Sequence, residues 1–282
     1  MKPKLATRSA IEEAAVRAAG RGARILTRFY ETGLTARHKG EVDLVTKADL
    51  ESQKAIVGVL SKAFPDHAIL AEEEKFGHDR SLEGPIWVID PLDGTTNYAH
   101  GFPMFGVSIA YRDGGETQFG LVYHPLLKEL FTAHRGKGAR LNGRKIAVSR
   151  TDQVHLSLLA TGFPYNRRTS PENNLNLFCY FEMAAQCVRR AGAAVLDLAN
   201  LSCGRFDGFW EPNLAPWDIA AGSLLVEEAG GKVTDFSGNP ITDLRCGEMV
   251  ASNGRLHDRL LEGIREARKF SIPNHARTTP WG

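Results

Sequence analysis

The sequence of 282 residues lacks the features that mark membrane, disulfide-rich or strongly charged proteins. No stretch approaches the roughly 18 consecutive apolar residues of a membrane-spanning helix, and the start of the chain is polar and basic, unlike a signal segment. Cysteine is scarce, and the four thiols form no C-x-x-C pair, so reduced thiols in a cytosolic protein explain them better than a zinc site does. A net charge of +2 gives no bulk attraction to nucleic acid or to lipid. We therefore expect a cytoplasmic protein without membrane contact.

Hydrophobic patterning, in contrast, is well developed. Apolar residues at helical spacing predict helices over residues 9–30, 48–64, 172–186, 193–201, 219–229 and 256–267. Short apolar runs predict strands over residues 42–46, 68–71, 86–89, 104–112, 116–124, 130–133, 140–141, 156–160, 206–211, 232–234 and 249–251. Ser9 and Glu12 predict a capping box at the first helix. The pattern predicts an α+β fold with an N-terminal half (1–150), a C-terminal half (151–270) and a loose tail (271–282).

The densest chemical signal is the run D-P-L-D-G-T at residues 90–95, directly after a short apolar strand. Pro91 fixes its own φ and holds Asp90 in extended geometry. The carboxylates of Asp90 and Asp93 and the carbonyl of Leu92 can then face one cleft. These are hard oxygen ligands, which suit Mg²⁺ rather than zinc. Capping or solvation would explain a single Asp in a turn, but the whole run favours a metal site.

Two further features of this region suit phosphate hydrolysis. The backbone N–H groups of Gly94 and Thr95 lie at a predicted helix start, where phosphate binds readily. Thr95 and a nearby acid such as Asp49 could orient an attacking water and act as its general base. No Ser-His-Asp or Cys-His nucleophile signature competes with this scheme.

Two acids distant in sequence could complete the site. Glu72 follows the predicted strand at 68–71, although an acidic triplet is more often a solvated face. Asp218 stands before the predicted helix at 219–229, where capping is the simpler role. A capping carboxylate can also face a metal, so both readings stay open.

At these residues the sequence resembles the inositol monophosphatase family. The three matching segments are A-E-E at 71–73, W-V-I-D-P-L-D-G-T-T-N at 87–97 and W-D-I-A-A-G at 217–222. Their order and separation also fit, and the resemblance extends from the first helix to about Ala267. One departure is Ala71, where the family usually has glycine.

The resemblance implies a layered αβαβα sandwich of the inositol monophosphatase and fructose-1,6-bisphosphatase type. It implies a homodimer that uses two or three Mg²⁺ per active site and is sensitive to lithium. The metal ligands that it implies are Glu72, Asp90, the Leu92 carbonyl, Asp93 and Asp218. The catalytic residues that it implies are Thr95 and Asp49 around the attacking water, together with Glu72 and Asp93. Substrate contacts would come from Asp93, Gly94, Thr95, Gly192, Ala194, Glu211 and Asp218, with Lys39 near the site.

Read from the residues alone, Gly192 and Ala194 could equally be small residues for helix packing, and Lys39 a solvated surface lysine. The implied activity is hydrolysis of a small phosphate monoester, with myo-inositol monophosphate favoured by the segment A-T-G-F-P at 160–164. The alternative substrates are fructose 1,6-bisphosphate, histidinol phosphate, NADP and 3′-phosphoadenosine phosphates. A further alternative is an additional non-catalytic role in transcription or ribosome maturation, for which the basic stretch 135–150 could supply contacts, although overall charge does not indicate nucleic acid.

Overall fold

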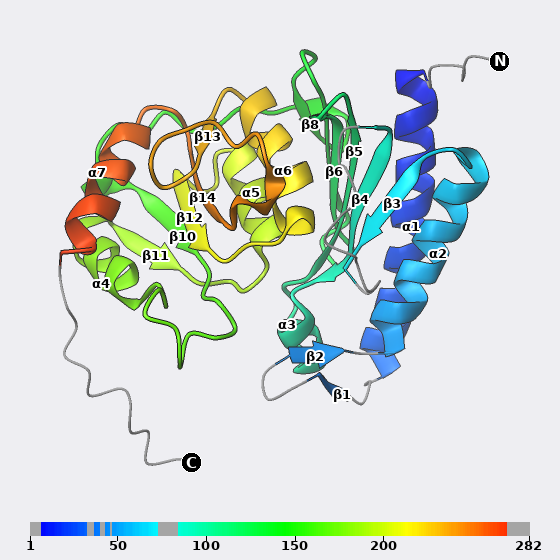
Figure 1. Ribbon diagram of the computed structural model, residues 1–282, viewed down its shortest axis with the longest axis horizontal. Helices are drawn as coiled ribbons and strands as arrows, with labels where there is room; N and C mark the ends of the chain where they lie inside the picture. Colours follow the sequence, from blue (N-terminus) through cyan, green and yellow to red (C-terminus); the bar gives the residue numbers. More distant parts are fainter. Residues whose placement is uncertain (1–6, 33–36, 40–42, 46, 73–83, 270–282) are drawn as a thin grey trace.

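The computed structural model describes residues 7–32, 37–39, 43–45, 47–72 and 84–269. Helices and sheets alternate in five layers, which Figure 1 shows edge-on. The predicted α+β sandwich is therefore confirmed. No helix among the described residues has both the length and the apolar character needed to cross a membrane.

The larger sheet has seven strands in the order β3-β4-β5-β6-β7-β8-β9. β3 and β4 are parallel, and every later neighbour is antiparallel, as hairpin connections require. Their bounds are β3 Ala68–Ala71, β4 Ile86–Asp93, β5 Gly106–Asp113, β6 Glu116–His124, β7 Glu129–His134, β8 Ala139–Leu141 and β9 Arg144–Lys145.

The smaller sheet has five strands in the order β11-β10-β12-β14-β13. Its strands are β10 Leu158–Thr161, β11 Cys187–Arg189, β12 Gly208–Pro212, β13 Lys232–Thr234 and β14 Glu248–Ser252. A separate two-stranded sheet joins β1 (Arg37–Lys39) to β2 (Asp43–Val45).

Helices fill the other three layers. α1 (Arg8–Thr32) and α2 (Lys47–Ala63) cover the outer face of the larger sheet, and Gly22 lets them cross closely because a Cβ there would stand 2.7 Å from Ile56 Cδ1. α5 (Ala194–Ser202) and α6 (Pro216–Glu228) lie between the sheets. α4 (Leu175–Ala184) and α7 (His257–Ala267) cover the smaller sheet. Three clusters of buried apolar side chains hold these layers together.

The sequence patterns located most elements, and the differences have local causes. The capping box at Ser9 is wrong, because α1 begins at Arg8 and Thr7 Oγ1 accepts from Ala10 N–H at 3.3 Å. β11 was not anticipated, since three residues are too short to reveal a period. Part of the predicted strand 42–46 and all of the tail 271–282 lie outside the described residues. The division into halves at residue 150 remains a prediction; the structure places the seven-stranded sheet before it and the five-stranded sheet after it.

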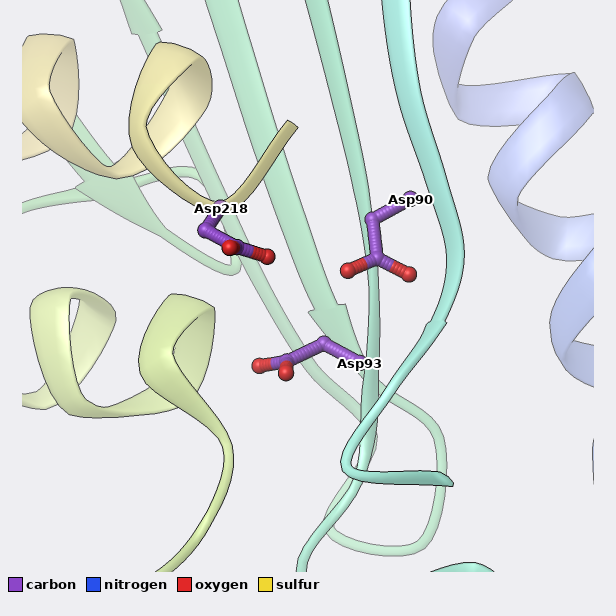
Figure 2. A group of neighbouring side chains, drawn as sticks. All are labelled: Asp90, Asp93 and Asp218. Carbon is purple, nitrogen blue, oxygen red and sulfur yellow. The ribbon is translucent and has the colours of Figure 1, made fainter. Parts of the chain in front are cut away.

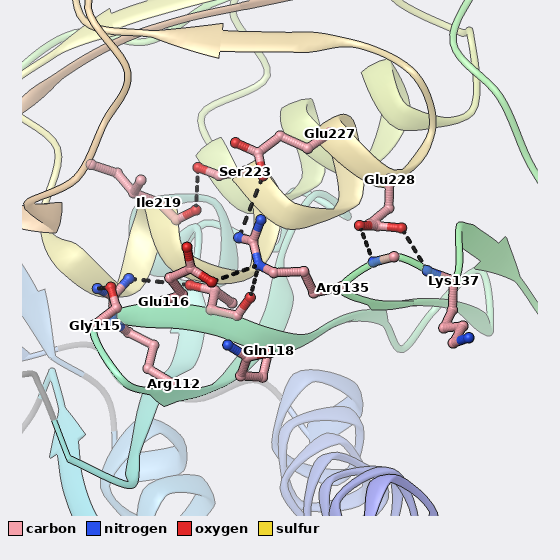
Figure 3. Close-up of polar contacts among 12 residues, drawn as sticks. Arg112, Gly115, Glu116, Gln118, Arg135, Lys137, Ile219, Ser223, Glu227 and Glu228 are labelled. Atoms are coloured by element: carbon pink, nitrogen blue, oxygen red, sulfur yellow. Dashed lines mark hydrogen bonds and ion pairs between the residues drawn. The ribbon is translucent and has the colours of Figure 1, made fainter.

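Helix α6 is fixed to the larger sheet along its whole length. Near its start, Ser108 Oγ donates to the Trp217 carbonyl at 3.4 Å. At its middle, Gly120 of β6 lies against the backbone of Ala221. Figure 3 shows its C-terminal end, where the Glu228 carboxylate accepts from the backbone N–H groups of the β7–β8 turn. The position of α6 matters because its first turn carries Asp218.

Candidate active site

The turn after β4 is held by hydrogen bonds from its own residues. Leu92 N–H donates to Asp90 Oδ1 at 2.9 Å, and Thr95 Oγ1 donates to the Leu92 carbonyl at 3.1 Å. The pairing of β4 with β5 shifts register between Asp90 and Asp93, which interrupts the regular alternation of side chains. Gly94 has a φ of +87°, and a Cβ there would stand 2.7 Å from the Met104 carbonyl, so this turn requires glycine.

Three carboxylates meet beside this turn. Figure 2 shows Asp90 and Asp93 pointing from β4 toward Asp218 of α6. Each of the three offers an oxygen, and these oxygens all lie within 4.8 Å of one another. The structure therefore brings together acids separated by more than a hundred residues, as the sequence predicted.

Asp218 reaches the cluster from inside the helix. The predicted helix start at Ile219 is wrong, because α6 begins at Pro216 and Asp218 is its third residue rather than the residue before it. Asp218 Oδ2 instead accepts from Ala215 N–H at 2.7 Å, which is the side-chain half of a capping box. This bond fixes one carboxylate oxygen.

Burial raises the pKa values of all three carboxyls, and the charges of neighbouring acids raise those of Asp90 and Asp93 further. Burial, followed by the charges of Glu72, Asp93, Asp218 and Asp49, raises the pKa of Asp90 well above its usual value. Burial and Asp218 raise the pKa of Asp93 to about 8, against the backbone N–H groups that bind it. Burial raises the pKa of Asp218 to about 6. Crowded carboxyls of this kind are stabilised as anions by a bound cation.

The other predicted acids lie at different depths. Glu72, at the end of β3, is half-buried and lines the same cleft as the three aspartates. Asp49 is the third residue of α2, is 1% exposed, and is close enough to raise the pKa of Asp90. Among the described residues Asp49 does not line the cleft. Lys39 belongs to β1, and its side chain lies outside the described part.

The start of α5 forms the opposite wall. Val195 N–H donates to Asp93 Oδ2 at 2.9 Å, so the helix N-terminus orients this carboxylate. Gly192, with a φ of +81°, and the buried Ala194 both line the cleft. The Asn97 amide joins the two walls, because Nδ2 donates to the carbonyls of Met104, Ala191 and Gly192. Asn97 was only part of a motif in the sequence, and this bridging position was not anticipated.

Glu211 lies at the far end of the cleft, on β12. Its carboxylate occupies the space beside Gly162, where a Cβ would stand 2.0 Å from Oε1. Asn174 joins the two sides: Nδ2 donates to the backbone carbonyl of Gly162, and Oδ1 accepts from the indole Nε1 of Trp210 at 2.8 Å. Burial and then the charge of Asp218 raise the pKa of Glu211 well above its usual value. No sequence pattern had singled out Asn174.

The cleft has a volume of about 490 Å³, a size suited to a small molecule. Its acidic end supplies only oxygen donors, and carboxylates in this crowded arrangement fit a hard divalent cation such as Mg²⁺. The cleft thus combines three features. The aspartate cluster is a candidate cation site, the turn after β4 offers backbone N–H groups, and Glu211 is a separate acid for the rest of a ligand.

Comparison with known proteins agrees with this geometry. The profile of the inositol monophosphatase family matches residues 7–269. An inositol-1-monophosphatase of Synechocystis sp. is 45% identical over 223 residues, which is 79% of this chain and 77% of that protein. The Nus factor SuhB of Pseudomonas aeruginosa is 44% identical over 256 residues, covering 89% of this chain and 94% of the relative. The structure of inositol monophosphatase from Anabaena (Nostoc) sp. superposes with a TM-score of 0.82 at 41% identity, covering 92% of this chain and 96% of that one. The chain belongs to the inositol monophosphatase family and is a phosphatase.

Proposed function

We propose that this phosphatase hydrolyses a small phosphate monoester, preferably myo-inositol monophosphate, with Mg²⁺ as its cofactor. The observation that carries the proposal is the meeting of Asp90, Asp93 and Asp218 within 4.8 Å in a cleft whose far wall carries Glu211. The first-named relative is an inositol-1-monophosphatase, and this favours the inositol ester.

The metal ligands in this proposal are Glu72, Asp90, the Leu92 carbonyl, Asp93 and Asp218. Bound Mg²⁺ would lower the pKa of a coordinated water and neutralise charge on the phosphoryl group. The number of ions, two or three, follows only from the family resemblance.

The chain's own groups would position the reactants. The N–H groups of Gly94 and Thr95 would donate to phosphate oxygens at the start of α3 (Thr95–Ala99). Thr95 Oγ1, anchored on the Leu92 carbonyl, would orient the attacking water. Asp49, which lies behind the cleft wall, would receive the proton of this water through the Thr95 hydroxyl and so act as the base. In the overall reaction, a water oxygen bonds to phosphorus, the bond to the alcohol oxygen breaks, and that oxygen gains a proton.

The leaving alcohol would be bound by the far wall. Glu211 would accept from substrate hydroxyls, while Gly192 and Ala194 would let the substrate approach the backbone before α5. Asp93 and Asp218 would contact the substrate as well as the metal.

The test is phosphate release from inositol 1-phosphate by the purified protein with Mg²⁺, compared with the Asp93→Asn variant. We expect wild-type turnover to depend on Mg²⁺ and the variant to lose at least about 100-fold in kcat, as expected when a metal ligand is removed. No release by the wild type, or undiminished release by the variant, would contradict the proposal. A panel containing fructose 1,6-bisphosphate, histidinol phosphate, NADP and a 3′-phosphoadenosine phosphate would then rank the substrates.

A second candidate function is participation in transcription. It is favoured by the similarity to Nus factor SuhB from several bacteria, at 40–44% identity. Complementation of a deletion strain tests it: rescue by the inactive Asp93→Asn protein would make the binding role primary, whereas failure to rescue would favour catalysis. Dimer formation and a cytoplasmic location complete the proposal; light scattering and cell fractionation would check them.

A further inference from the structure

Arg190 stands apart from the other residues of the cleft because of its charge. Among the described residues that line the cleft it is the only base, against the five acids Glu72, Asp90, Asp93, Glu211 and Asp218. It belongs to the connection from β11 to α5 and is exposed. None of the roles proposed above uses its guanidinium.

The backbone beside Arg190 fixes where this guanidinium lies. A Cβ on Gly192 would stand 3.0 Å from Arg190 Nη1, so the guanidinium rests over the bare Cα of Gly192. Asn97 holds this stretch of backbone through the carbonyls of Ala191 and Gly192. Arg190 therefore lies on a fixed part of the cleft wall. This part is between Val195, whose N–H binds Asp93, and the far end of the cleft.

The charges that face Arg190 come from α5 and β12. Asp197 of α5 is 1% exposed, and its Oδ1 accepts no hydrogen bond from any described residue. Arg190 interacts electrostatically with this acid and with Glu211. With four of the lining acids assigned to the metal, the rest of the cleft holds one cation, Arg190, and one acid, Glu211, with Asp197 buried behind the wall. A second anionic group on the substrate would meet the charge of Glu211 as well as that of Arg190.

Two uncharged polar residues also line the cleft. They are Asn166 and Asn213, and Asn213 Nδ2 donates to Asn166 Oδ1 at 3.3 Å. Amides, a guanidinium donor and a carboxylate acceptor suit hydroxyl groups, each of which donates one hydrogen bond and accepts others.

We propose that Arg190 is a specificity-determining residue, which with Glu211 binds adjacent hydroxyls of a neutral polyol and so favours its monophosphates over esters that carry a second anionic group. The guanidinium donates to one hydroxyl, and the Glu211 carboxylate accepts from its neighbour. The inference rests on the proposed function and assigns the part of the substrate beyond the scissile phosphate.

The test compares three substrates in Mg²⁺: inositol 1-phosphate, ethyl phosphate, which has no free hydroxyl, and fructose 1,6-bisphosphate. For Arg190→Leu we expect the ratio of kcat/KM for inositol 1-phosphate to that for ethyl phosphate to fall by about 10- to 100-fold, the loss of a charge-assisted hydrogen bond. The fall should appear mainly in KM for the inositol ester. Arg190→Lys keeps the positive charge but loses the planar guanidinium with its several donors. Its kcat/KM ratio should lie between those of the wild type and Arg190→Leu.

The matched control is Arg189→Leu, because Arg189 is the neighbouring exposed arginine and does not line the cleft; its ratio should equal that of the wild type. An unchanged ratio in Arg190→Leu overturns the role of Arg190. So does a larger loss on the bisphosphate than on inositol 1-phosphate, which would make Arg190 an anion site. A wild type that hydrolyses none of the three substrates contradicts the proposed function itself, and the inference with it.

Discussion

The carboxylate of Glu211 occupies the space in which residue 162 would otherwise carry a side chain. A Cβ on Gly162 would stand 2.0 Å from Oε1 and 2.3 Å from Oε2 of Glu211. Glu211 lies near the end of β12, and Gly162 directly follows the neighbouring parallel strand β10, where both strands reach the cleft. The absence of a side chain at Gly162 therefore leaves the space in which the Glu211 carboxylate lies.

Gly162→Ala should test this dependence without unfolding the protein. The backbone of Gly162 is not left-handed, and the atoms that a Cβ meets are the end of a flexible side chain. We expect Glu211 to swing away and KM for inositol 1-phosphate to rise about 10-fold, the usual loss for a polar contact to substrate. The free energy of unfolding should change by less than about 1 kcal/mol. Steady-state kinetics and urea denaturation measure both.

The control is Gly58→Ala on α2, where a Cβ would meet nothing within 4 Å. That variant should keep wild-type KM and gain up to about 1 kcal/mol of stability, as alanine does inside helices. A Gly162→Ala enzyme with unaltered KM would show that Glu211 does not depend on this space.

Gly120→Ala should act on the metal site through α6. A Cβ on Gly120 would stand 2.9 Å from the Ala221 carbonyl oxygen and 3.1 Å from its Cα, and backbone atoms cannot turn aside. We expect a loss of about 1–3 kcal/mol in the free energy of unfolding, as for other overpacked cores. Because α6 must move away from β6, Asp218 moves with it and Mg²⁺ should bind more weakly. Urea denaturation and calorimetric Mg²⁺ titration provide the readouts, and wild-type values in both would refute close packing at this position.

The contact between α6 and the β7–β8 turn can be tested separately. Glu228 accepts from the N–H groups of Gly136, Lys137 and Gly138 at 2.6, 3.0 and 2.7 Å. Figure 3 shows the Glu228 carboxylate facing Lys137 in this contact. Gly136 and Gly138 both have positive φ, which turns these donors toward one concave point. Glu228→Ala should cost about 1–3 kcal/mol and speed hydrogen exchange at the three amides.

Glu227→Gln is the matched control for that experiment. Glu227 pairs with Arg135 at 3.5 Å, and both side chains are about 40% exposed, so its loss should cost less than about 1 kcal/mol. If both variants lost the same free energy of unfolding, Glu228 would contribute no more than an exposed ion pair. Slow hydrogen exchange retained in Glu228→Ala would likewise show that Glu228 does not hold the three amides.

The sequence predicted those parts of the site whose residues lie in short, distinctive segments. Asp90 and Asp93 lie in one short run, and Asp218 lies in a distinctive segment, so the meeting of the three could be predicted. The packing that places them could not, since it depends on Gly120 and Ala221, which are a hundred residues apart and follow no period. The same holds for Asn97 and Asn174: single amides become bridges only when distant carbonyls are brought beside them. The charge of Arg190 was visible in the sequence, but its isolation among acids appears only once the cleft has formed.

Mg²⁺ should stabilise the protein more as the pH rises. In the metal-free protein, the pKa of Asp93 is raised from 3.8 to about 8 and that of Asp218 to about 6. Between the usual pKa of 3.8 and the raised pKa of about 8, the folded state binds more protons than the unfolded state. The stability of the metal-free protein therefore falls as the pH increases through this range. Mg²⁺ replaces those protons and stabilises the folded state by mass action. The increase in Tm that Mg²⁺ produces should therefore be larger at about pH 8.5 than at about pH 5.5, and EDTA should abolish it. Asp93→Asn removes one repelling charge, so that variant should be more stable than the wild type in EDTA at high pH, yet respond less to Mg²⁺. A Mg²⁺ effect independent of pH would mean that the carboxylates do not bind the ion in competition with protons.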